Sequence, residues 1–84
     1  MEYDVYLRRE AMDFLRKCRP HDRDHLLRML DVIANDPFKS GDFTERDISG
    51  RDIQGWVSLK FAILYWPDHF AKEVRVAQIR LADR

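Results

Sequence analysis

The sequence contains little of the material from which several protein classes are built. Its 84 residues include one cysteine, three glycines and three prolines. A single cysteine, Cys18, excludes an intrachain disulfide and a cysteine-rich metal site, so the expected location is a reducing cytoplasm. The few glycines and prolines exclude collagen-like and linker-like chains. No apolar run approaches the roughly 20 residues that a membrane helix needs, and no secretory signal is visible at the N-terminus.

Net charge is absent as well. Fifteen basic residues balance 15 acidic ones, although 36% of all residues are charged. A neutral chain attracts no polyanion over long range. Arginine nevertheless outnumbers lysine eleven to four, and guanidinium groups bind phosphate and carboxylate in a bidentate manner. Two interpretations stay open: a surface of paired charges, or a local arginine site for an anion within a neutral chain.

The apolar content is sufficient for one folded domain over residues 1–84. Apolar residues make up 45% of the chain and aromatic residues 12%. This composition argues against disorder and supplies one modest core. No repeat, low-complexity stretch or linker divides the sequence.

The N-terminal half predicts a short strand followed by two helices. Residues 3–7 place apolar side chains at the two-residue period of a strand. From Arg9 the apolar spacing changes to that of one helix face, and this stripe ends at Cys18. Pro20 ends the first helix and fits the first turn of the second. The second helix is predicted to stop at residues 35–37, where Asn-Asp-Pro follows the last apolar position.

The C-terminal half predicts three strands. Residues 46–53 are expected to form a short strand bent at Gly50, because glycine within a strand often marks a bulge. Residues 56–66 alternate over their whole length and predict one long strand. After a turn, residues 73–79 predict the last strand. The predicted fold is therefore α+β in the order β-α-α-β-β-β, with two antiparallel helices packed on one face of an antiparallel sheet.

Three segments, in this order and spacing, resemble the RelE/ParE superfamily of bacterial toxins. The second helix ends in LDVIANDP at residues 30–37, which is similar to the family's "L..L..dP" ending. The segment KFAILYW at residues 60–66 resembles the family's third strand, and VRVAQIR at residues 74–80 resembles its last strand. The resemblance extends from residue 3 to residue 84. The segment TERDISGR at residues 44–51 is not a family-wide pattern and indicates a divergent subfamily.

The resemblance implies the toxin component of a type II toxin–antitoxin module. Such toxins are neutralised by a small antitoxin protein that wraps around them. RelE-like members are ribosome-dependent mRNA endonucleases, whereas ParE-like members share the fold and poison DNA gyrase. A RelE-like nuclease is the first expectation; a gyrase inhibitor and a non-catalytic protein-binding or assembly module are the alternatives. The resemblance implies no cofactor and no metal, and it leaves a homodimer open.

Metal-independent RNA cleavage needs a base, an acid and positive groups on the phosphate. The resemblance assigns the positive groups to the open face of the sheet. Lys60 falls on or near a third-strand arginine of the family, Arg80 on an arginine that ends the last strand, and Arg51 near a second-strand lysine. If Tyr65 is aligned with the family's tyrosine instead, Ala62 occupies the third-strand arginine position. Both alignments stay open.

Other side chains are candidates for chemistry or for partner binding. His69, in the predicted turn before the last strand, is either an acid or base or a plain solvent-exposed residue. Glu45 is either a general base or a salt-bridge partner of Arg46. Trp56 and Trp66 are expected on the open face, where aromatic rings beside cations stack nucleobases or anchor proteins. Their apolar area favours contact with an antitoxin segment or a second copy of the chain.

Overall fold

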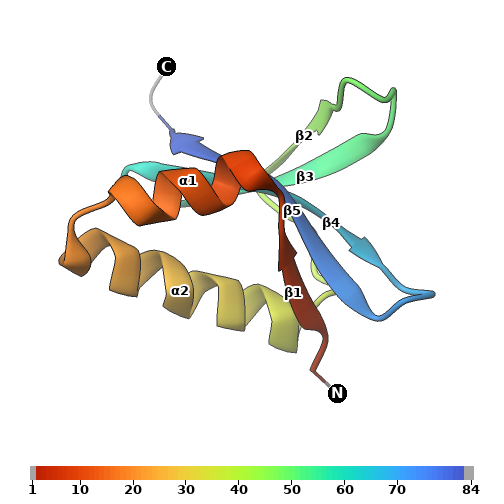
Figure 1. Cartoon of the computed structure of the whole chain (residues 1–84). Coiled ribbons are helices and arrows are strands. Elements are labelled where there is room, and N and C mark those ends of the chain that lie inside the picture. The colour runs from red at the N-terminus through yellow and green to blue at the C-terminus, as the bar shows by residue number, and fades with distance from the viewer. Residues whose placement is uncertain (1, 83–84) are drawn as a thin grey trace.

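The computed structural model describes residues 2–82 and shows two antiparallel helices on one face of a five-stranded sheet (Figure 1). The elements are β1 (Asp4–Leu7), α1 (Arg9–Lys17), α2 (Pro20–Asn35), β2 (Phe43–Arg46), β3 (Asp52–Ser58), β4 (Phe61–Asp68) and β5 (Glu73–Leu81). The strand order is β1-β5-β4-β3-β2. The α+β class and the helix layer are confirmed. Neither helix is long and apolar enough to cross a membrane, as judged over residues 2–82.

The expectation of a wholly antiparallel sheet is wrong at one strand pair. β1 runs parallel to β5, whereas the other three pairs are antiparallel. The first strand does add to an edge of the sheet, as expected for so short a strand. The long path between β1 and β5 permits parallel pairing, because a parallel neighbour needs a crossover connection rather than a tight turn.

Hydrogen bonds from a side chain of α2 to backbone carbonyls at the end of α1 link the two helices, in addition to apolar contacts. Pro20 occupies the first turn of α2, where its missing N–H leaves no hydrogen bond unmade. The Arg23 guanidinium donates hydrogen bonds to the carbonyl oxygens of Leu15 (3.2 Å) and Cys18 (3.0 Å) at the end of α1. Carbonyls in the last turn of a helix lack the usual helical partners. The Leu15 carbonyl also accepts a hydrogen bond from the Cys18 backbone N–H at 3.2 Å. Arg23 therefore ties the start of α2 to the end of α1.

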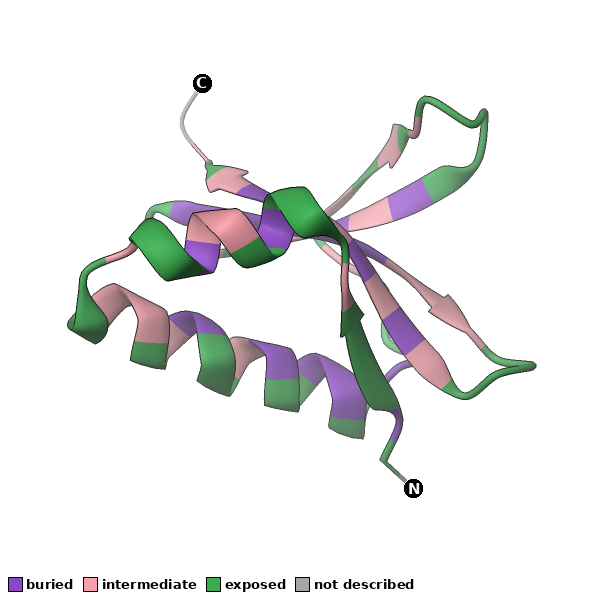
Figure 2. Cartoon of the chain, viewed as in Figure 1, coloured by how far each residue is buried: buried purple, intermediate pink, exposed green. Residues whose placement is uncertain are grey.

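The main core lies between the helices and the sheet, where the buried segments face one another (Figure 2). It consists of Tyr3, Ala11, Leu15, Leu26, Leu30, Ile33, Phe61, Ile63, Tyr65, Val74, Val76 and Ile79. A smaller cluster of Ile53, Ala62 and Leu64 lies on the other side of the sheet. We call that side the open face, because both helices pack against the opposite side. β4 is buried on both faces over residues 61–65.

The single long strand predicted over residues 56–66 is wrong. The chain reverses at Leu59 and Lys60, and residues on either side belong to β3 and β4. Apolar alternation continues from Val57 through Leu59 to Phe61, so the period does not reveal the turn. Neither turn residue is the glycine or asparagine that short hairpin turns favour. Leu59 has a positive φ of 55°.

The strand predicted over residues 46–53 is also wrong. A tight turn through residues 47–51 separates β2 from β3. The Asp47 carboxylate accepts a hydrogen bond from the Ile48 amide at 2.8 Å and holds the turn. Gly50 has a φ of 88°, which glycine adopts without steric cost. This glycine therefore marks a turn, not a bulge.

We expect Leu59→Gly to stabilise the protein by up to about 1 kcal/mol. A positive φ costs a residue with a Cβ roughly 1 kcal/mol. The Leu59 side chain is 74% exposed and contributes little packing. The larger unfolded-state entropy of glycine offsets part of the gain. Urea unfolding followed by tryptophan fluorescence measures the change. Leu59→Ala keeps the Cβ and is the control; a Leu59→Gly protein less stable than Leu59→Ala contradicts the argument.

Candidate functional site

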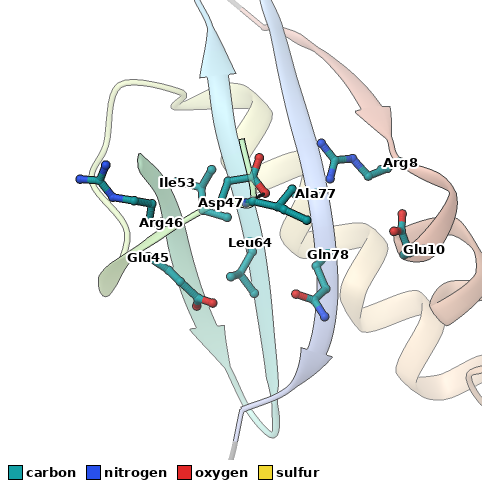
Figure 3. A pocket seen from close by; sticks show the side chains of 10 residues that line it. Arg8, Glu10, Glu45, Arg46, Asp47, Ile53, Leu64, Ala77 and Gln78 are labelled. Atoms are coloured by element: carbon teal, nitrogen blue, oxygen red, sulfur yellow. Dashed lines mark hydrogen bonds between the residues drawn. The ribbon is translucent and has the colours of Figure 1, made fainter. Parts of the chain in front are cut away.

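The open face is hollowed between the hairpin turn of residues 47–51 and the end of β1. The hollow has a volume of about 270 Å³ and a floor of Ile53, Leu64 and Ala77. Its walls are formed by Arg8, Glu10, Glu45, Arg46, Asp47, Ile48 and Gln78. Glu45 from β2 and Gln78 from β5 extend toward Leu64 from opposite sides (Figure 3). An apolar floor with charged and amide groups around it suits a partner that offers both a flat apolar surface and polar atoms.

Arg80 lies on the open face, and its charge is paired. Its Nη2 lies 2.7 Å from Oε1 of Glu45, and its Nη1 lies 3.4 Å from Oε2. The pair spans the sheet from β5 to β2 across β4 and β3, and the β4 residue beside Arg80 is Ala62, which has a small side chain. Both side chains remain 39% exposed. An incoming anion at Arg80 therefore competes with a carboxylate of the same chain.

Lys60 does not lie on the open face, contrary to the expectation that it lies there with Arg80. It sits in the turn between β3 and β4, and its Nζ lies 3.4 Å from Oδ2 of Asp22 on α2. The open-face residue paired with Arg80 in the sheet is Ala62. This placement favours the alignment through Tyr65, in which Ala62 stands at the third-strand arginine position.

His69 is separated from Arg80 as well. Its Nδ1 lies 2.9 Å from the Tyr3 hydroxyl oxygen, and its ring stacks on Phe38 with 4.3 Å between centroids. β4 runs from the Arg80 end of the sheet to the His69 end, and its 8 residues span about 25 Å. Arg80 and His69 therefore cannot act on the same phosphate within one chain.

Arg51 and Trp66 lie together at the end of the open face remote from Arg80. The Arg51 guanidinium centre is 3.7 Å from the Trp66 ring centroid. On the other side, the Arg75 guanidinium lies 5.8 Å from the Trp66 centroid and 5.2 Å from that of Tyr6. We call Tyr6, Arg75, Trp66 and Arg51 the stacked row. It crosses β1, β5, β4 and the residue before β3, and it alternates aromatic rings with guanidinium groups.

Trp56 faces the helices, so the expectation that both tryptophans lie on the open face is wrong for Trp56. It packs against the main core, and the Lys39 Nζ lies 5.5 Å from its ring. In one continuous strand, residues 56 and 66 point the same way. The turn at residues 59–60 breaks that alternation, because even-numbered residues of β3 face the helices whereas even-numbered residues of β4 face away.

Similarity in sequence is slight: no protein-family model and no curated protein matches the chain. Solved structures do match it. A chain of the toxin–antitoxin complex RelBE2 from Mycobacterium tuberculosis has a TM-score of 0.80 at 17% identity, over 96% of this chain and 99% of that chain. The archaeal RelE–RelB complex from Pyrococcus horikoshii OT3 gives 0.78 at 13% identity, over 100% and 99%. The isolated E. coli RelE toxin gives 0.74 at 16% identity, over 98% and 86%. The chain has the RelE fold.

On this RelE fold, three open-face residues escaped the sequence reasoning: Tyr6, Arg8 and Arg75. Tyr6 points away from the apolar side of the first strand, which was a signal in the alternation. Arg75 alternates with Val74 and Val76 in the same way on the last strand. Arg8 follows β1 and lines the hollow from its edge. Tyr6 and Arg8 lie outside the segments that carry the resemblance, and Arg75 lies within the last of them, VRVAQIR, between the two valines.

Cys18, at the end of α1, and Asp47, in the hairpin turn, each have a shifted pKa. Burial, and then the Asp22 charge, raises the pKa of the Cys18 thiol, so this half-buried cysteine remains a protonated packing residue. The hydrogen bond from the Ile48 backbone N–H lowers the pKa of the Asp47 carboxyl group, so this group is charged at neutral pH. Within residues 2–82, no three His, Cys, Asp or Glu side chains are grouped as a metal site requires.

Proposed function

We propose that this protein is the toxin of a type II toxin–antitoxin module and that it acts as a RelE-like, ribosome-dependent mRNA endonuclease. A small antitoxin protein is its partner. The observation that carries the proposal is the RelE fold over 98% of the chain, combined with a hollowed sheet face that bears arginine at both ends. The proposal places RNA on that open face.

The proposed reaction needs no metal. The ribose 2′-hydroxyl attacks the adjacent phosphate, the bond to the 5′-oxygen breaks, and a 2′,3′-cyclic phosphate forms. Arg80 stabilises the charge that grows on the phosphate. Glu45, whose carboxylate already lies at Arg80, takes the 2′-hydroxyl proton, and the leaving 5′-oxygen takes a proton from water. His69 has no part in this scheme, because it lies at the far end of β4.

The second candidate is a non-catalytic protein-binding module on the same fold. Three observations favour it: the Arg80 charge is paired with Glu45, Ala62 stands where a cation is expected, and the chain has no net charge. Binding to a ribosome normally gains from the release of counterions by several cations, and this chain offers few in net terms. A gyrase inhibitor is the third candidate, and the growth experiment below distinguishes it from the other two.

Growth of a bacterial host tests the toxin assignment. Expression of the chain is expected to arrest growth, and co-expression of the small protein encoded beside its gene is expected to restore it. Total mRNA from the arrested cells is expected to carry new 5′ ends within coding regions. Normal growth at high expression contradicts the toxin assignment. Arrest with intact mRNA and DNA breaks trapped on gyrase selects the gyrase branch instead.

A further inference from the structure

We propose that the stacked row is a subsite that binds single-stranded RNA by stacking on its bases. The row is Tyr6, Arg75, Trp66 and Arg51, and it lies at the end of the open face remote from Arg80. The inference rests on the proposed function, because its ligand is the RNA. This end of the open face binds the bases, whereas the phosphate chemistry takes place at Arg80.

The geometry of the row supplies planes on which bases stack. Arg51 lies 3.7 Å from the Trp66 ring, a distance that requires the guanidinium to lie flat on it. The Arg75 guanidinium is fixed by carboxylates of Asp68 (3.5 Å) and Glu73 (2.9 Å). Aromatic rings and guanidinium planes both stack on nucleobases without reading the sequence. Neighbouring strands hold the members of the row side by side.

The row is accessible and continuous with the central hollow. Tyr6 is 54% exposed, and Arg51 is exposed. A second hollow of about 80 Å³ lies between Tyr6, Arg8, Trp66 and Arg75. It shares Arg8 with the larger hollow that Glu45 lines. The two hollows also share Ala77, so they adjoin on the open face between the row and Glu45, the partner of Arg80.

Charge favours an anionic ligand at this end of the face. Within residues 2–82, neither Arg8 nor Arg51 forms an ion pair, whereas Arg80 is paired with Glu45. The Asp47 carboxylate lies near both free arginines. The Asp47 backbone N–H donates a hydrogen bond of 2.7 Å to the Arg51 carbonyl oxygen, and this bond does not use the guanidinium group. An acidic polypeptide would use the two free charges and contact Trp66 with apolar side chains, but it carries no series of flat rings to match the stacking planes of the row. Single-stranded RNA uses both, so it is the ligand that fits.

The two tryptophans allow the contact to be observed directly. In a Trp56→Phe chain, Trp66 is the sole tryptophan, because the sequence holds two. Titration with a short oligoadenylate RNA is expected to quench Trp66 fluorescence in a saturable manner. The Trp66→Phe chain retains only Trp56, which faces the helices, and is the matched control expected to show no quenching. Circular dichroism establishes that both chains are folded.

Substitutions of Arg51 separate stacking from charge. In the Trp56→Phe chain, Arg51→Ala is expected to weaken RNA binding about tenfold, as the loss of one stacking partner does. Arg51→Lys keeps the charge but not the plane, and is expected to lose most of the same affinity. Arg16→Ala, on α1 and paired with Asp13, is the matched control on the helix side and should leave affinity unchanged. With two phosphate contacts, the logarithm of the RNA-binding constant is expected to fall with the logarithm of the salt concentration with a slope of about −1.4.

Three results overturn the inference. Equal quenching by duplex RNA or by poly-L-glutamate shows that charge, not base stacking, is recognised, and the glutamate result points to an acidic protein partner. Quenching of Trp56 rather than Trp66 places the RNA elsewhere. Absence of quenching while ribosome-dependent cleavage persists removes the subsite and leaves the proposed function intact. Quenching of Trp66 in a chain that cleaves no mRNA supports the subsite and counts against the proposed nuclease.

Discussion

Arg80→Ala is expected to lower ribosome-dependent mRNA cleavage by about 100-fold or more and to abolish growth arrest. Removal of one preorganised donor to a charged transition state typically has an effect of this size. Arg80 is the arginine on the open face whose guanidinium already holds an oxyanion, the Glu45 carboxylate, at 2.7 Å. Cleavage on translating ribosomes with purified chain measures the loss. The fold should survive, because the side chain is 39% exposed.

Lys60→Ala is the matched control for Arg80→Ala. Lys60 directly precedes β4, the strand that pairs with β5 and Arg80. Its ammonium nevertheless contacts Asp22 on the helix side. The Lys60 side chain is 64% exposed, so the loss of this ion pair should change stability by less than about 1 kcal/mol. Cleavage by Lys60→Ala is expected to equal that of the unmodified chain. Loss of cleavage in Lys60→Ala with retention in Arg80→Ala would reverse the assignment of the two residues.

Ile63→Ala is expected to lower the free energy of unfolding by about 3 kcal/mol. Ile63 is 1% exposed and packs in the main core at the centre of β4. Truncation of a buried isoleucine removes its transfer free energy and leaves a cavity, at a typical cost of about 2–5 kcal/mol. That is a large part of the about 5–15 kcal/mol that stabilises a domain. Chemical denaturation measures the change.

Val57→Ala is the control for the core substitution. Val57 lies on the neighbouring strand β3, pairs with Ala62 and is 40% exposed. Its truncation should lower the free energy of unfolding by less than about 1 kcal/mol. Equal effects of Ile63→Ala and Val57→Ala would contradict the placement of the core between the sheet and the helices.

The helical half of the fold was predictable because its signals are local. Apolar spacing and Pro20 placed both helices within a few residues of their observed bounds. The strands of the second half were merged because the Leu59–Lys60 turn carries no turn residue and interrupts no apolar alternation. The parallel pairing of β1 with β5 depends on contacts between residues far apart in the sequence, which a local pattern does not record.

The face of the sheet on which a site residue lies depends on where its strand begins and ends, because successive residues alternate between the two faces. Arg80 was assigned to the open face by the resemblance, and it lies there as part of β5, which extends two residues beyond the predicted strand. Trp56 and Lys60 were placed there wrongly, because one long strand was assumed in place of two. The Glu45–Arg80 ion pair joins residues 35 positions apart across two intervening strands, so no spacing rule reveals it. The stacked row depends on the same long-range register.

The central claim is that the open face cleaves mRNA on the ribosome. The most direct measurement uses purified chain, ribosomes paused on a defined mRNA with a known codon in the decoding site, and the same mRNA free in solution. We expect cleavage at the paused codon, no cleavage of the free mRNA, and no cleavage by the Arg80→Ala chain. Intact mRNA on paused ribosomes, from a chain that arrests growth in cells, would contradict it.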